Sequence, residues 1–161
     1  MPLRSNWTGE ECPIARSLEV LGDPWALLVL RQAFMGVRRF DQLRDQLRIA
    51  DNVLSKRLAG LVEAGLLRKQ PYRDERRTRD EYVLTEAGED TFPIITALAL
   101  WGDKHRPHPD PTVHMDVIHR RCGHATLTAD HCSHCGQRLT VDGTFWRHAG
   151  RQPRDLVLAG R

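Results

Sequence analysis

Residues 39–66 read RFDQLRDQLRIADNVLSKRLAGLVEAGL, and this stretch decides the fold. Phe40, Leu43 and Leu47 recur at three- and four-residue intervals, which predicts a short helix with one apolar face. After a tight turn, leucines and valines recur at the same spacing up to Gly65, so a second helix is expected there. Two short helices joined by a tight turn are typical of a helix-turn-helix.

Two further helices are predicted before this motif. Residues 14–21 carry apolar side chains at helical spacing and are followed by a Gly-Asp-Pro stop. Residues 25–35 form an almost continuous apolar run that is closed by Gly36. Such a run suits a helix that is buried on most sides and ends at a glycine. We expect this second helix to be the centre of the core.

The apolar periodicity changes after Gly65. Residues 66–72 and 79–84 are interpreted as the two strands of a hairpin with a basic tip. A helix is then expected over residues 86–104, bent or interrupted at Pro93. Because that helix is apolar on nearly all sides, it needs a second packing partner, which we expect to be another subunit.

Basic residues concentrate in the middle third of the chain. The whole chain has a formal net charge of +3. Residues 36–85 hold 12 Lys and Arg against 8 Asp and Glu, which leaves 12 against 13 for the rest. A local excess of this kind is what attraction to a polyanion requires. It indicates a nucleic-acid partner for the middle third.

Neither an export signal nor a membrane span is indicated. The first residues lack an apolar signal core, and the longest apolar stretch, residues 94–101, is too short to cross a bilayer. Three of the four cysteines cluster and Cys12 stands alone, a pattern that favours metal binding in a reducing compartment over disulfides. We therefore expect a cytoplasmic protein that does not contact the membrane.

Six short phrases follow one another along the first two thirds of the chain. They are Cys12-Pro13-Ile14, Gly22-Asp23-Pro24-Trp25, Arg39-Phe40-Asp41-Gln42-Leu43, Leu54-Ser55-Lys56-Arg57-Leu58, Leu61-Val62-Glu63-Ala64-Gly65-Leu66 and Tyr82-Val83-Leu84-Thr85-Glu86-Ala87-Gly88. In this order they resemble the HxlR-type family of winged-helix bacterial transcriptional regulators. The resemblance covers residues 12–105 and implies a sequence-specific DNA-binding regulator that acts as a homodimer through its first helix and its last long helix.

The expected fold is mainly α with some β, a winged helix-turn-helix with a two-stranded wing. A recognition helix at about residues 51–64 would enter the major groove of double-stranded DNA, and the wing at about 73–79 would reach the minor groove. Polar side chains read base edges, while Lys and Arg bind phosphates. The predicted DNA-contacting residues are Arg38, Arg39, Asn52, Ser55, Lys56, Arg57, Arg76, Arg77 and Arg79.

Three prolines in residues 106–111 indicate a linker, which leaves residues 112–161 as a small separate module. The module contains the spacing ligand-x-x-ligand-Gly twice, at His119 with Cys122 and at Cys132 with Cys135. Such turns form the two halves of a zinc ribbon, and a module this small needs the metal to fold.

We therefore predict one structural zinc ion per chain, held by His119, Cys122, Cys132 and Cys135. Three alternatives stay open at this point: another histidine among His124, His131 and His134 as the fourth ligand, a metal-free cysteine cluster, or a redox pair at Cys132 and Cys135. Beyond the site, a strand over residues 141–146 and a loose end are expected.

We expect the regulator to be a repressor that blocks its promoter, and several other functions remain as alternatives. In the family that the chain resembles, a cysteine at the place of Cys12 serves some members as a redox sensor, but an inert thiol is the simpler interpretation. The ribbon could instead bind a partner protein while the winged helix mainly dimerises. An unidentified small-molecule effector is also left open. An enzyme is not expected, because the sequence has neither a His-Glu-x-x-His motif nor a Gly-rich phosphate loop.

Overall fold

The computed structural model describes residues 6–150 and 152–161, which form two compact units. The first unit holds the described residues up to Ala33 together with Val37–Thr85, and the second holds Phe34–Gly36 together with the described residues from Glu86 onward. The two compact units divide near residue 85 and not at the linker predicted over residues 106–111. A compact unit need not fold on its own, so the predicted boundary between independently folding domains stays a prediction.

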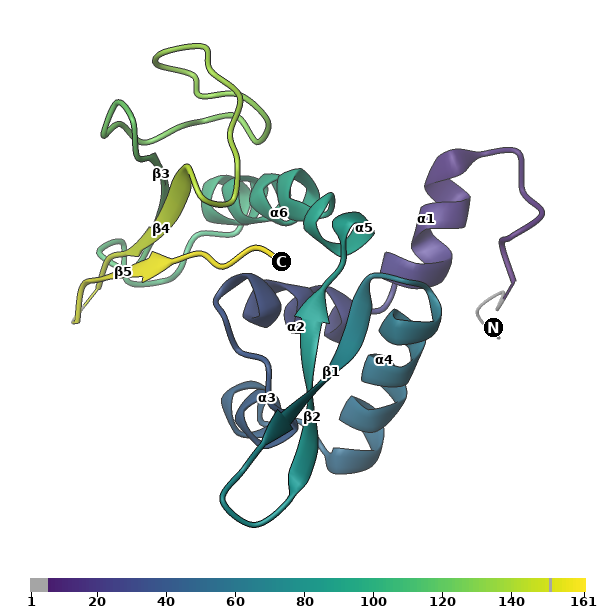
Figure 1. Ribbon diagram of the computed structural model, residues 1–161. Coiled ribbons are helices and arrows are strands. Elements are labelled where there is room, and N and C mark those ends of the chain that lie inside the picture. The colour runs from purple at the N-terminus through teal and green to yellow at the C-terminus, as the bar shows by residue number, and fades with distance from the viewer. Residues whose placement is uncertain (1–5, 151) are drawn as a thin grey trace. The chain divides into compact units, whose positions relative to one another are not determined.

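The helix-turn-helix consists of α3 (Phe40–Leu47) and α4 (Asp51–Glu63), as predicted (Figure 1). Arg48 between them adopts a left-handed backbone conformation with φ of 52°, which turns the chain sharply. The apolar faces are buried as their spacing requires, through Leu43 and Leu47 on α3 and Leu54, Leu58 and Leu61 on α4. This packing leaves the opposite face of α4 free to carry polar side chains.

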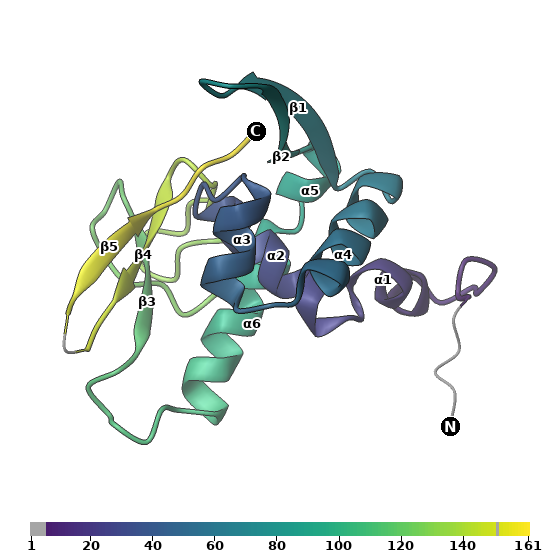
Figure 2. The same ribbon diagram turned by 90° about the horizontal axis from the view of Figure 1, so that it is seen from below.

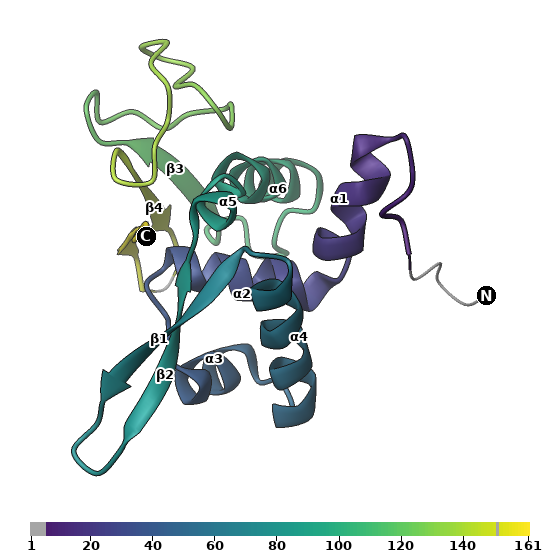
Figure 3. The same ribbon diagram turned by 45° about the vertical axis from the view of Figure 1, so that its right-hand side comes forward.

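The wing is an antiparallel hairpin of β1 (Leu67–Arg73) and β2 (Thr78–Leu84), and Figure 3 shows it passing beside α3 with its tip reaching beyond α3 and α4. The backbone N–H of Tyr82 donates to the carbonyl oxygen of Arg38 over 2.8 Å. That bond attaches the segment before α3 to β2, so it holds the wing in place relative to the first helix of the motif.

The two helices before the motif are α1 (Pro13–Leu21) and α2 (Pro24–Phe34), also close to their predicted bounds. Val29 and Leu30 on α2 are completely buried, in agreement with a central helix. No residue of α1 is buried, and Ile14 and Leu18 are exposed on it. An amphipathic helix with an uncovered apolar face calls for a further partner.

The second unit begins with α5 (Glu86–Glu89) and α6 (Phe92–His105), so the expected helix is interrupted just before Pro93, which lies in the first turn of α6. The ring of Phe92 packs on that of Phe34, with centroids 5.6 Å apart. The opposite side of α6 leaves large apolar residues exposed. They are Ile94, Leu98 and Trp101.

Three antiparallel strands complete the second unit in the order β3-β4-β5 (Figure 2). They are β3 (Met115–His119), β4 (Thr144–His148) and β5 (Arg154–Val157), with Val117 and Trp146 buried between them and the rest of the unit. The strand expected over residues 141–146 begins later, at Thr144. The expectation of a loose end was wrong, because β5 pairs with β4 and Leu158 is buried.

Candidate nucleic-acid interface and metal centre

The outer face of α4 presents a row of polar side chains. Asn52, Ser55 and Lys56 are exposed on the first half of the helix, while Leu54 and Leu58 anchor the opposite face in the core. The Asn52 amide can donate and accept at once, and the Lys56 ammonium can bind a phosphate or a guanine. The structure thus presents three of the four predicted residues of the recognition helix to solvent.

Arg57 lies differently from its three neighbours. Its Nη2 atom is 2.7 Å from Oδ2 of Asp23, and its side chain is only 31% exposed. The other carboxylate oxygen of Asp23 accepts the backbone N–H of Trp25 over 2.9 Å, in the first turn of α2. Arg57 therefore links α4 to the start of α2, and its charge is balanced by a carboxylate.

The tip of the wing is a tight turn over residues 74–77, closed by a 3.0 Å hydrogen bond from the N–H of Asp74 to the carbonyl of Arg77. Arg76 and Arg77 are exposed and have no ion pair with any residue that the structure describes. Arg79 is also exposed, with its Nε 3.6 Å from Oδ2 of Asp74. Two uncompensated guanidinium groups at the end of a hairpin are suited to phosphate or minor-groove contact.

Arg38 and Arg39 lie where α3 begins. Arg39 is exposed, and its guanidinium carbon lies 4.5 Å from the ring centroid of Tyr72 on β1. This cation–π contact orients Arg39 beside the wing. Tyr72 was not identified from the sequence as a site residue, although an aromatic side chain in a charged strand is a signal that could have found it. Arg38 is half-buried.

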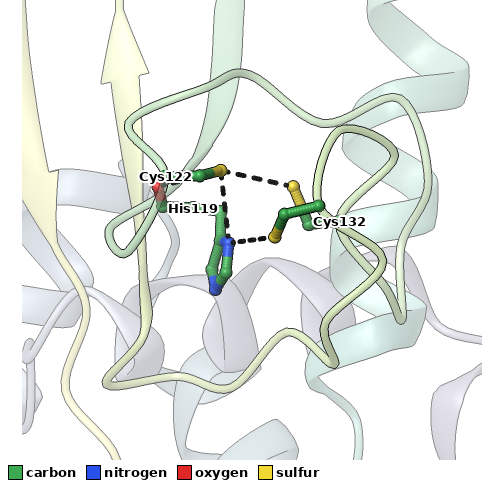
Figure 4. A group of neighbouring side chains, drawn as sticks. His119, Cys122 and Cys132 are labelled. Atoms are coloured by element: carbon green, nitrogen blue, oxygen red, sulfur yellow. Dashed lines mark hydrogen bonds between the residues drawn. The ribbon is translucent and has the colours of Figure 1, made fainter.

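The second unit brings together the four predicted metal ligands, whose donor atoms all lie within 4.8 Å of one another. Figure 4 shows His119, Cys122 and Cys132 pointing toward one another. The Nδ1 atom of His119 is 3.5 Å from the sulfur of Cys122 and 3.3 Å from that of Cys135, and the sulfurs of Cys122 and Cys132 are 3.7 Å apart.

These three separations are close to those around a tetrahedral zinc ion. With Zn–S bonds of about 2.3 Å and Zn–N bonds of about 2.0 to 2.1 Å, neighbouring S and N atoms lie about 3.6 Å apart and two sulfurs about 3.8 Å apart. The nearest pairs of donor atoms at this site come within a few tenths of an ångström of those values. Four donors of the Cys3His type suit zinc, and they would occupy all four of its positions.

The two halves of the site are built in the same way. The N–H of Gly123 donates to the carbonyl of His119, and the N–H of Gly136 donates to that of Cys132, each over 2.8 Å. The two glycines also share a left-handed φ, 71° and 72°. A side chain at either position would be strained, so the glycine that follows each second ligand is required by the turn.

The chemistry of the thiols also points to a cation. Burial tends to raise the pKa of Cys132, but hydrogen bonds from the backbone of Cys135 and His134 and from the side chains of Cys122 and Cys135 together outweigh it and lower that pKa. For Cys122, a backbone hydrogen bond involving His124 lowers the pKa, but burial and hydrogen bonds to the other two cysteines outweigh it and raise the pKa. Thiolates this close repel one another, and a bound cation would relieve that repulsion.

The other histidines of the module are engaged elsewhere. The rings of His124 and His134 stack with centroids 3.5 Å apart, and His131 lies 2.9 Å from the Asp130 carboxylate. His119, by contrast, is only 4% exposed and sits at the end of β3 with Nδ1 facing the sulfurs. Of the four histidines considered from the sequence, the structure therefore brings only His119 into the cluster.

Cys12 does not belong to this cluster. It is an exposed free thiol in extended conformation directly before the first turn of α1. In the described residues, no helix is both long enough and apolar enough to cross a bilayer.

A helix-turn-helix followed by a β-hairpin with a basic tip defines the winged-helix class of DNA-binding proteins. Residues 20–110 match the model of the HxlR-like helix-turn-helix family, more than half of the chain, and the chain belongs to that family. It is a DNA-binding transcriptional regulator of the helix-turn-helix type.

Similar proteins agree with this assignment. An uncharacterised HTH-type transcriptional regulator of Mycobacterium tuberculosis is 44% identical over 128 residues, which cover 80% of each chain. The crystal structure of a candidate transcription factor matches 90% of this chain and 98% of its own, with a TM-score of 0.68 and 32% identity. The reduced form of the redox regulator HypR matches 59% of this chain and 94% of its own, with a TM-score of 0.55 and 27% identity.

Proposed function

We propose that the protein acts as a homodimeric repressor that binds double-stranded promoter DNA. The helix α4 enters the major groove with Asn52 and Ser55 toward base edges and Lys56 toward a base or a phosphate. Arg76, Arg77 and Arg79 of the wing lie at the minor groove, and Arg38 and Arg39 contact the backbone. One observation carries the proposal: exposed polar side chains on α4 and uncompensated arginines on the wing tip lie in the same unit. Arg57 is left out of this surface because it pairs with Asp23.

The homodimer is supported by two uncovered apolar helix faces. On α6, Leu98 is 48% and Trp101 is 56% exposed, and Ile94 lies one turn before Leu98. On α1, Ile14 and Leu18 are one turn apart and also exposed. Faces of this kind on otherwise well-packed proteins mark interaction surfaces. A second copy of the chain is the partner that the family membership favours.

We further propose one structural zinc ion per chain in the Cys3His cluster. When bound, the metal would join the end of β3 to the loop that carries Cys132 and Cys135, since the two pairs of ligands come from separate turns. With four protein ligands, no position stays open for a substrate, so the site has no catalytic role. The same proposal places the protein in the cytoplasm, where thiolate ligands stay reduced.

Selection of bound duplexes from a random DNA pool tests the central proposal. The wild-type protein is expected to enrich one sequence with two half-sites about one helical turn apart, as a symmetric dimer requires. Asn52→Ala is expected to relax the preference at one base position of each half-site, at about 1 to 3 kcal/mol. Arg154→Ala, on the exposed strand β5 of the other unit, serves as the control and should select the wild-type sequence. Failure to enrich any duplex at low salt would contradict the proposal.

Two other functions are separated by simple measurements. A protein that dimerises but enriches no duplex would favour the alternative in which the C-terminal ribbon binds a partner protein. A redox function of Cys12 predicts that diamide lowers DNA affinity in the wild type and not in Cys12→Ser. The exposure of Cys12 favours this second candidate.

A further inference from the structure

The first unit contains a cavity of about 740 Å³ that neither the DNA surface nor the metal cluster explains. Its walls come from α1, the start of α2 and the side of α4 that carries Arg57 and Leu61, with the exposed Lys56 at the edge. Part of the wall is apolar, and part carries charged groups from all three helices. The apolar lining residues are Val20, Ala26, Leu61 and Ala64.

Arg57 lies in the wall of this cavity, and only part of its guanidinium group has a partner. Its Nη2 atom pairs with Asp23, but its Nε atom is buried and has no hydrogen-bond partner in the part of the chain that the structure describes. A guanidinium presents Nε–H and Nη–H side by side, which matches the two oxygens of a carboxylate. A buried donor without an acceptor is uncommon and costly, and it indicates a missing partner.

The other two cations of the cavity, Arg16 and Lys56, differ in whether they already have a partner. The Nη1 atom of Arg16 donates to the carbonyls of Glu10 and Glu11, at 2.6 and 2.8 Å, and is therefore held in place by the backbone. Lys56 lies at the rim of the cavity, exposed and with no ion pair to a described residue. The carboxylates of Glu19 and Glu63 also line the cavity, and that of Glu19 accepts the Thr8 hydroxyl over 2.7 Å. The place for an anion is therefore the side of the cavity that carries Arg57 and Lys56.

We propose that this cavity binds a small organic acid with an apolar body. The carboxylate pairs with Nε and Nη2 of Arg57 and takes the place of Asp23, while the apolar body covers Val20 and Leu61. Asp23 can be released without loss of the first turn of α2, because its bond to the N–H of Trp25 uses the other oxygen. No covalent step is involved.

Binding at this place acts on the recognition helix. The ion pair between Arg57 and Asp23 joins α4 to α2, and a ligand that breaks it changes how α4 is held. A ligand that alters DNA affinity by some factor must itself bind with an affinity altered by the same factor when DNA is present. The cavity is therefore the place where a metabolite would regulate this protein.

The test measures ligand binding to the full-length protein without DNA, so its outcome is independent of the proposed DNA-binding function. Benzoate is the probe, because it combines one carboxylate with an apolar ring. Benzamide has nearly the same shape and no charge. Titration calorimetry is expected to show saturable binding of benzoate and at least about tenfold weaker binding of benzamide, since the charged hydrogen bonds are lost.

Two variants locate the site. Arg57→Gln is expected to weaken benzoate binding about tenfold or more, and Asp23→Asn to strengthen it severalfold by removing the competing carboxylate while asparagine still caps α2. Arg68→Gln, an exposed arginine of β1 that does not line the cavity, should bind benzoate like the wild type. Thermal unfolding followed by circular dichroism shows that each variant is folded.

Three results would overturn the proposal: no saturable binding of benzoate at millimolar concentration, equal binding of benzamide, or unchanged affinity in Arg57→Gln. If Arg57→Gln does not fold, the comparison of Asp23→Asn with the wild type decides, because weaker or equal binding there contradicts a direct competition for Arg57.

Discussion

The sulfur atoms of Cys122 and Cys132 lie 3.7 Å apart although nine residues separate them in the chain. That separation is too long for a disulfide, whose sulfurs lie about 2.05 Å apart, and it agrees with two ligands of one metal ion. The loop between the two cysteines contains little apolar material, and a metal ion is the interaction that would hold its ends together.

Elemental analysis should therefore find about one zinc ion per chain in protein purified without chelators. Cys132→Ser removes a buried ligand, so we expect the zinc content to fall below about half an equivalent and the melting temperature to fall with it. Cys12→Ser is the matched control and should keep the full zinc content. Wild-type protein with less than about half an equivalent would contradict the metal site.

The double variant Arg76→Ala, Arg77→Ala should flatten the salt dependence of DNA binding. Each lost phosphate contact lowers the slope of log K against log salt by about 0.9, so a dimer that loses four wing contacts changes by roughly 3 to 4. Fluorescence anisotropy at several salt concentrations measures the slope. Arg154→Ala removes an exposed arginine of the other unit and should leave the slope unchanged, whereas an unchanged slope in the wing variant would refute the wing contacts.

Two glycines of the recognition-helix region should respond to alanine with opposite signs. Gly65 ends α4 with φ of 77°, so Gly65→Ala is expected to lower the free energy of unfolding by about 1 kcal/mol or more. Gly60 lies within α4 with open space around it, so Gly60→Ala is expected to raise that free energy by about 0.5 to 1 kcal/mol. Urea unfolding of both variants provides the comparison, and a shift of the same sign in both would contradict it.

Substitution on the uncovered face of α6 should dissociate the dimer. Leu98→Glu is expected to raise the dimer dissociation constant at least about thirtyfold, because a charge would be buried in the centre of the interface. Analytical ultracentrifugation measures the constant. Leu127 is 82% exposed in a loop, and Leu127→Glu serves as the control for an added surface charge. A dimer of wild-type strength in Leu98→Glu would mean that another surface joins the subunits.

The helices could be predicted because their information is local. Leu54, Leu58 and Leu61 repeat at the helical period, and Gly65 with its left-handed φ follows two residues after the end of α4. The clustering of His119, Cys122, Cys132 and Cys135 could be predicted for a similar reason, since each pair lies three residues apart and is followed by a glycine that the turn requires. Both predictions therefore rest on the spacing of residues that are close together in the sequence.

What could not be predicted depends on distant pairs of residues. The pairing of Arg57 with Asp23 joins two helices, and nothing beside Arg57 in the sequence distinguishes it from Lys56, which stays exposed. The strand β5 was missed because its four residues have no strong alternation, and only their register against β4 defines them. The sequence predicted His119 but left His124, His131 and His134 open, since only the folded chain shows which ring lies against the sulfurs.

The hydrogen bond from the N–H of Ala159 to the carbonyl of Phe34 also has a consequence for biosynthesis. Phe34 leaves the ribosome early, and its partner Ala159 is translated more than a hundred residues later. The winged helix can fold while synthesis continues, but the ribbon unit is completed only when translation has reached Ala159. A ribosome-bound nascent chain that ends before Ala159 would therefore carry a folded winged helix together with a second unit that has not completed folding.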